Sequence, residues 1–141
     1  MPVKTYWEND GFVYETNGIV TVAEIQKAGL DFHKVPKGVT PKYKIIKALN
    51  IDELLLSEAD VFEISMTDLS LSRKYPDLKI AMVAHKGQVT EKFMKYLKIS
   101  WAVNSSWEIR IFNSLATARD WLNLVRELKK PVEPNKGNIQ E

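Results

Sequence analysis

Residues 79–122 constrain the fold of this chain more than any other stretch, because strand-like and helix-like segments alternate along them. Residues 80–84 form an almost unbroken apolar run, which is typical of a strand covered on both faces, and 109–112 form a second short strand. The amphipathic segment 88–101 separates the two strands. Two strands joined by a helix of this kind pair in parallel. This half of the chain therefore predicts an α/β protein.

The amino-terminal half predicts a hairpin, a helix and a third strand. Two β-prone runs, 3–8 and 12–15, flank Asn9-Asp10-Gly11, and Asp-Gly between such runs is a hairpin signal. Thr21 and Glu24 have capping-box spacing, so we expect a helix to begin there and to end near Val35. Beyond a proline-containing loop, residues 43–49 are predicted to form a strand.

The second helix is predicted to begin at Ser57, because Glu58 and Asp60 would then lie in its first turn, where negative charge suits the helix dipole. Apolar residues at helical spacing define its expected core face: Ala59, Phe62, Met66 and Leu69. Val61, Ile64 and Leu71 lie away from that face, and we expect them to form a partner surface. The partner would be a second copy of the chain or another protein, unless the first helix covers these residues.

The predicted fold is a single mixed sheet of about five strands, with an amino-terminal antiparallel hairpin followed by parallel strands, and four helices. The last helix is expected to be capped by Asn113 or Ser114. With 45% hydrophobic and 27% charged residues, one ordinary core is expected. We expect residues 1–130 to form one domain and residues 131–141 a flexible tail.

Composition and charge argue against several classes of function. The chain contains no cysteine, which excludes disulfides and thiolate chemistry, and its apolar runs are too short for a membrane span. Residues 1–10 turn acidic before an apolar segment can form, so we expect no secretory signal and a cytoplasmic location. A net charge of +2 does not indicate nucleic-acid binding. Lys44 and Lys47 point to opposite faces if their segment is a strand, and a solvated edge would accommodate them.

His85, Lys86 and Gly87 form the best candidate site for a ligand or an anion, because they follow an apolar strand and precede a helix. The alternative is an ordinary loop, since no second histidine and no orienting acid lie nearby in the sequence. His33 is too far from His85 to suggest a metal site. The glycines form no phosphate-binding loop, so we expect no cofactor.

Several segments resemble the bacterial STAS-like family related to the sporulation anti-sigma-factor antagonist. They are G-I-V-T-V-A-E at 18–24, Y-P-D-L-K at 75–79, K-I-A-M-V-A at 79–84 and F-N-S-L-A-T-A-R-D-W-L at 112–122. The resemblance covers about residues 5–125. Its motifs are mainly structural, with Phe112, Ala118, Trp121 and Leu122 as packing positions.

This resemblance implies a non-enzymatic module that binds a protein partner or a small ligand. Together with the apolar residues of the second helix, it leads us to expect a regulatory or protein-interaction module that self-associates through that helix. Phospho-switched members carry D-S-x-G before the second helix, but this chain has A-L-N-I-D-E-L-L-L-S-E. Ser57 is the nearest candidate switch position, although an N-cap role already explains it. One alternative is a small-molecule or lipid carrier that uses Phe93, Trp101 and Trp107, unless these tryptophans only close the core. A second alternative is an enzyme of unknown class that uses His85.

Overall fold

The fold consists of one five-stranded sheet with helices on both faces. A computed structural model describes residues 2–103 and 105–123. Its elements are β1 (Val3–Glu8), β2 (Gly11–Thr21), α1 (Val22–Asp31), β3 (Tyr43–Leu55), α2 (Glu58–Lys74), β4 (Lys79–Val83), α3 (Gln88–Ala102), β5 (Glu108–Phe112) and α4 (Leu115–Trp121). The predicted fold class is confirmed. The boundary at residue 130 and the tail lie outside the described residues.

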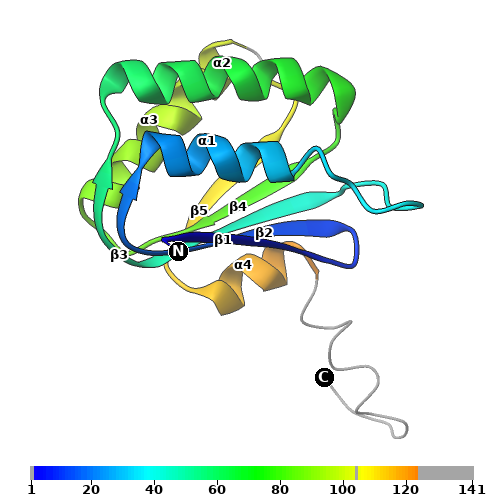
Figure 1. The fold of residues 1–141 in the computed structure, drawn as a ribbon, viewed down its shortest axis with the longest axis horizontal. Helices are drawn as coiled ribbons and strands as arrows, with labels where there is room; N and C mark the ends of the chain where they lie inside the picture. Colours follow the sequence, from blue (N-terminus) through cyan, green and yellow to red (C-terminus); the bar gives the residue numbers. More distant parts are fainter. Residues whose placement is uncertain (1, 104, 124–141) are drawn as a thin grey trace, which may run out of the picture.

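The strand order explains how the helices are arranged. The strands follow one another in sequence order, β1 antiparallel to β2 and the others parallel, so Ile80 pairs with Ile109 as expected. Right-handed crossovers that always step in the same direction place their helices on the same face. Helices α1, α2 and α3 accordingly cover one face of the sheet, and α4 lies on the other (Figure 1). None of the described helices is both long and apolar enough to cross a lipid bilayer.

Local signals in the sequence set the ends of several elements. The hairpin turn is Asn9-Asp10, with Asn9 at a φ of 51°, and Gly11 already belongs to β2. Thr21 and Ser57 cap α1 and α2, and both predicted capping positions are confirmed as full capping boxes. Helix α1 ends at Asp31, earlier than the predicted end near Val35.

The third strand differs most from its prediction. Strand β3 extends to Leu55 instead of ending at residue 49, because β2 pairs with it as far as Thr21 through two irregularities in register. It is also the central strand, which contradicts the expectation that Lys44 and Lys47 lie at a solvated edge. The two lysines do point to opposite faces, as the alternation of a strand requires. Only 4% of Lys44 is exposed, under the three helices.

Helix α2 is rotated relative to its prediction, so the proposed partner surface is wrong. Val61 is 3% exposed, and Ile64 and Leu71 pack against the main core, whereas Phe62 is 54% exposed. The inward face also contains serines, which made it look like a surface. Ser65 satisfies its hydroxyl by donating to the Val61 carbonyl at 2.8 Å, so its burial costs little.

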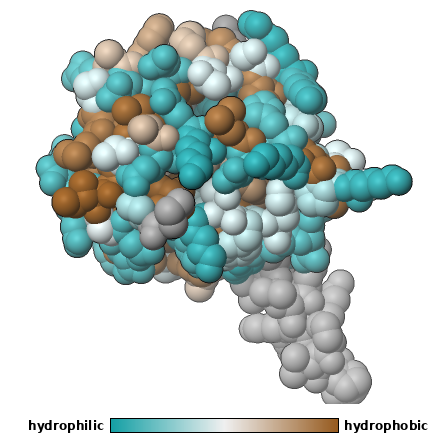
Figure 2. Space-filling model, viewed as in Figure 1, coloured by the Kyte–Doolittle hydropathy of each residue, from teal (hydrophilic) through white to brown (hydrophobic). Residues whose placement is uncertain are grey.

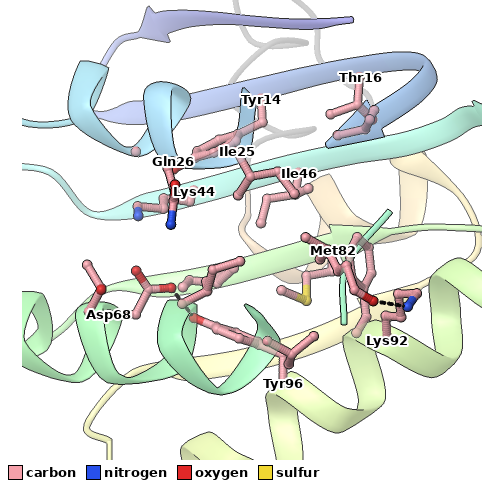
Figure 3. A pocket seen from close by; sticks show the side chains of 18 of the residues that line it. Tyr14, Thr16, Ile25, Gln26, Lys44, Ile46, Asp68, Met82, Lys92 and Tyr96 are labelled. Carbon is pink, nitrogen blue, oxygen red and sulfur yellow. Dashed lines mark hydrogen bonds between the residues drawn. The ribbon is translucent and has the colours of Figure 1, made fainter. Parts of the chain in front are cut away.

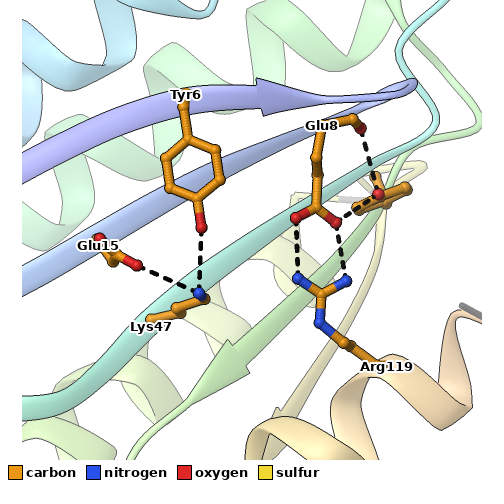
Figure 4. Close-up of polar contacts among 6 residues, drawn as sticks. Tyr6, Glu8, Glu15, Lys47 and Arg119 are labelled. Carbon is orange, nitrogen blue, oxygen red and sulfur yellow. Dashed lines mark hydrogen bonds and ion pairs between the residues drawn. The ribbon is translucent and has the colours of Figure 1, made fainter. Parts of the chain in front are cut away.

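A polar network ties the edge hairpin to α4 on the opposite face of the sheet (Figure 4). Arg119 of α4 donates two hydrogen bonds of 2.8 Å to the Glu8 carboxylate, and the Tyr43 hydroxyl donates to Glu8 at 2.8 Å. Beside it, the Lys47 ammonium donates to the Tyr6 hydroxyl at 3.1 Å and to the Glu15 carboxylate at 3.3 Å. These bonds raise the pKa of Lys47, although burial alone would lower it.

Candidate ligand-binding site

A cleft lies between the sheet and the three helices that cover its upper face in Figure 1. Its volume is about 310 Å³, at the lower end of the range of roughly 300–1,000 Å³ that is usual for small-molecule sites. Most of its lining side chains are aliphatic or aromatic (Figure 3): Ile25 of α1, Ile46 of β3, Ile64 of α2, Met82 of β4 and Phe93 of α3 are among them.

The cleft exists because α1 and α2 pack on different partners. Helix α2 packs on α3, whereas α1 packs on β1 and β2, so the two helices leave a gap above the central strands. Gly29 and Leu30 of α1 line this gap. A Cβ atom at Gly29 would meet no atom within 4 Å, which shows that this wall of the cleft is open space.

Lys44 forms the floor of the cleft at one end. Its ammonium lies 4.2 Å from the ring centroid of Phe32, 5.0 Å from that of Trp107 and 5.7 Å from that of Tyr14. Aromatic rings attract a cation through their negative faces but supply no hydrogen-bond acceptor as strong as a carboxylate. Burial lowers the pKa of Lys44, and the negative charge of Asp68 opposes part of that effect.

The other polar groups at this end come from α2, α3 and β2. The Tyr96 hydroxyl donates to the Asp68 carboxylate at 2.5 Å (Figure 3). Burial and the nearby Asp68 charge raise the pKa of Tyr96, so this hydroxyl stays protonated at neutral pH. Burial likewise raises the pKa of Tyr14, which lines the same cavity.

A different polar contact lies at the other end of the cleft. Lys92 of α3 donates a hydrogen bond to the backbone carbonyl of Leu56, close to Met82 (Figure 3). Lys92 is thus engaged in tying α3 to the segment between β3 and α2. The cleft therefore has a polar end at Lys44 and Asp68 and an apolar body that runs toward Met82.

Val61, Ile64 and Leu71, the predicted partner surface, line this cleft, whereas the predicted anion site and switch position lie outside it. His85, Lys86 and Gly87 form an exposed loop between β4 and α3, where the His85 carbonyl accepts a hydrogen bond from Thr90. Ser57 is exposed and accepts a hydrogen bond from the Asp60 amide at 3.0 Å as the cap of α2. An anion site at His85 and a modified Ser57 stay predictions.

The aromatic residues of the predicted carrier site separate into three environments. Phe93 lines the cleft, and Trp107 is 4% exposed beside Lys44, with its indole donating to the Tyr75 carbonyl at 2.7 Å. Trp101 is 64% exposed at the end of α3 and closes no core. Two of the three predicted residues are therefore at or next to the cleft.

Sequence reasoning missed Lys44, Asp68 and Tyr96 as site residues. Lys44 gave only a partial signal: a central strand of a parallel sheet is covered on both faces, but the sequence does not show that β3 is the central strand. Asp68 follows Val61 and Ile64 at helical spacing, but this signal is visible only once the inward face of α2 is known. Within residues 2–103 and 105–123, no three His, Cys, Asp or Glu side chains gather as a metal site.

Comparisons with known proteins show a similarity of structure. A scan of protein-family models finds no match, and a search of curated proteins finds no match either. The structure is similar to a crystal structure of an uncharacterised protein from Shewanella loihica PV-4, described as a DUF3478 family member with a SpoIIAA-like fold. The two share 16% sequence identity and a TM-score of 0.49, over 85% of this chain and 91% of that one.

Proposed function

We propose that this protein is a non-enzymatic binding domain whose cleft takes up a small molecule with a mainly apolar body. The cleft under α1, α2 and α3 carries this proposal, because it is open to solvent between α1 and α2 and lined mostly by apolar side chains. Apolar surface facing such a space is stabilised when a ligand replaces the water there.

The proposal is tested by filling the cleft from the α1 side. Gly29→Leu adds a side chain where the structure has open space, and Gly29→Ala is the matched control, since its single methyl leaves most of the volume free. We expect Nile red, a neutral apolar fluorophore, to bind the wild type and Gly29→Ala alike. Its dissociation constant should rise about tenfold in Gly29→Leu, which corresponds to about 1.4 kcal/mol.

Native mass spectrometry of freshly purified protein supplies an independent measurement. A co-purifying mass that is present in the wild type and missing in Gly29→Leu would support the cleft as the binding site. If the dye binds Gly29→Leu as well as the wild type and the purified protein carries no ligand, the carrier function is wrong.

Protein association, as expected of a regulatory module, is the second proposal. Phe62 on the outward face of α2 is 54% exposed and Leu30 on α1 is 65% exposed. On the same side of the molecule, hydrophobic side chains also gather where β2 leads into α1 and β3 into α2 (Figure 2), and Ile19 and Leu55 are exposed there. Large exposed apolar side chains of this kind mark interaction surfaces when they are contiguous.

Light scattering of the wild type and of Phe62→Glu tests self-association through α2. We expect a concentration-dependent dimer that Phe62→Glu weakens, because a charge would have to be buried in the interface. Thr67→Glu, on the cleft side of the same helix, is the control for added charge. A wild type that stays monomeric at all concentrations would remove this version of the function.

A further inference from the structure

The ammonium of Lys44 is buried without an ionic partner. Lys44 is 4% exposed, and among the described residues its nitrogen takes part in no ion pair and no hydrogen bond, only in contacts with aromatic rings. Isolated charges of this kind are costly to bury, and proteins normally pair them. Lys44 lines a cavity that is open to solvent, so a partner for its ammonium can come from outside the chain.

Asp68 is the acid whose charge acts on Lys44, but its carboxylate is bonded to another residue. Its carboxylate accepts the Tyr96 hydroxyl at 2.5 Å and forms no ion pair with Lys44 in the described residues. Tyr14 provides a second unused donor, because its hydroxyl is buried in the same cavity and has no hydrogen-bond partner among the described residues. Tyr14 lies on the neighbouring strand, two residues beyond Phe12, which pairs with Lys44.

Two donors without acceptors at the end of an apolar cleft define the head group that fits there. A cationic head would be repelled by Lys44, and a neutral head would leave the ammonium without an ion pair, since Asp68 acts on it only through its charge. A carboxylate accepts from both donors and forms the charge-assisted bond that the aromatic rings cannot supply. Burial lowers the pKa of Lys44, and a bound anion would raise it again.

We propose that the ligand of this cleft is an amphipathic monocarboxylate, with its carboxylate bound by the Lys44 ammonium and the Tyr14 hydroxyl and its apolar tail directed toward Met82. This inference rests on the proposed function, and it adds the chemical class of the ligand. The volume of about 310 Å³ favours a medium-length alkyl or aryl tail over a two-chain lipid.

The test compares two probes that differ only in the head group, decanoate and decanol, by isothermal titration calorimetry. The wild type should bind decanoate about tenfold or more tightly than decanol. Lys44→Met keeps an apolar side chain of similar length and should bring the ratio of the two affinities close to one. Tyr14→Phe keeps the ring, loses only the hydroxyl and should lower the ratio several-fold, which provides a readout should Lys44→Met fail to fold.

The outcomes separate the two proposals. Equal binding of decanoate and decanol to the wild type, unchanged by Lys44→Met and Tyr14→Phe, would overturn the carboxylate assignment and leave the carrier function standing. The carrier function and the carboxylate assignment would both be overturned if neither probe binds and if Gly29→Leu leaves the binding of Nile red unchanged. A decanoate preference that Lys44→Met preserves would place the anion elsewhere, the exposed loop at His85 being the next position to test.

Discussion

Position 11 has no room for a side chain, because a neighbouring residue occupies the space. The backbone conformation of Gly11 does not itself require a glycine. A Cβ atom at Gly11 would lie between 1.9 and 2.5 Å from three atoms of the Tyr43 ring. The ring cannot retreat without giving up the hydrogen bond from its hydroxyl to Glu8. The Asp-Gly dipeptide predicts a turn, but the glycine is required by packing across the β2–β3 pair.

We therefore expect Gly11→Ala to lower the free energy of unfolding by about 2 kcal/mol, the middle of the range for overpacking a core. The control is Gly29→Ala, where a Cβ meets open space and the helix should gain about 0.5–1 kcal/mol. Urea denaturation of both variants gives the comparison. Equal stability of Gly11→Ala and the wild type would mean that Tyr43 has another position available.

Glu8 makes stability depend on pH in a predictable direction. Burial by itself would raise the pKa of Glu8, but hydrogen bonds from Arg119 and Tyr43 outweigh it and hold the pKa below 4.5. A carboxyl group with a depressed folded-state pKa contributes stability that is complete above its unfolded-state pKa and is lost as pH falls through the folded value.

The stability difference between the wild type and Glu8→Gln should therefore be constant near neutral pH and shrink below about pH 4.5. Urea denaturation at a series of pH values measures it. Glu108→Gln, an exposed carboxylate on β5, is the control for general acid effects. A difference that stays constant down to about pH 2 would mean that Glu8 is not held ionised by Arg119.

At the scale of elements, the rotation of α2 decides which residues matter for stability. Val61 is 3% exposed and should cost about 2 kcal/mol when truncated to alanine, counting about 0.8 kcal/mol for each buried methyl-sized group and a cavity term. Phe62→Ala should change stability by less than about 0.5 kcal/mol, because Phe62 is 54% exposed. If urea denaturation finds Phe62→Ala the more damaging, the face predicted from apolar spacing is the inward one.

The same helix shows what could be predicted from the sequence and what could not. Its start at Ser57 was predictable, because capping depends on residues within one turn. The strands at Ile80 and Ile109 and their parallel pairing were also predictable, since a two-sided apolar run and a connecting helix allow little else. The inward face of α2 was not predictable, because two sets of apolar residues at helical spacing were both compatible with the sequence. Packing against the rest of the fold determines which set faces inward.

Lys44 illustrates the limit for the candidate site. Its burial follows from the position of β3 at the centre of the sheet, and strand order depends on contacts between segments far apart in the chain. The His85 loop, by contrast, looked functional from its place after a strand, yet it lies apart from the cleft. The ends of helices and strands can be predicted from residues close together in the sequence. A cleft cannot, because it is the space that remains between several packed elements.

At the scale of the whole molecule, the two faces of the sheet should respond differently to a ligand. Helix α1 packs on β1 and β2 and leaves a gap toward α2, so part of its inner side faces the cleft. Helix α4 lies on the opposite face of the sheet, where Arg119 anchors it to Glu8 (Figure 4). A ligand in the cleft contacts α1 and α2 directly but does not contact α4.

We expect decanoate to slow amide hydrogen exchange in α1 and in the facing part of α2, because the bound tail bridges two helices that otherwise pack apart. Local openings that expose amides become rarer when a ligand binds only the closed form, by about 2.7 kcal/mol at a ligand concentration 100-fold above the dissociation constant. Exchange in α4 is the internal control and should change less. Gly29→Leu should remove the ligand effect on α1, since its side chain occupies the same space. Uniform slowing across α1 and α4 would instead indicate that the ligand stabilises the protein only against global unfolding, with no separate opening of the cleft.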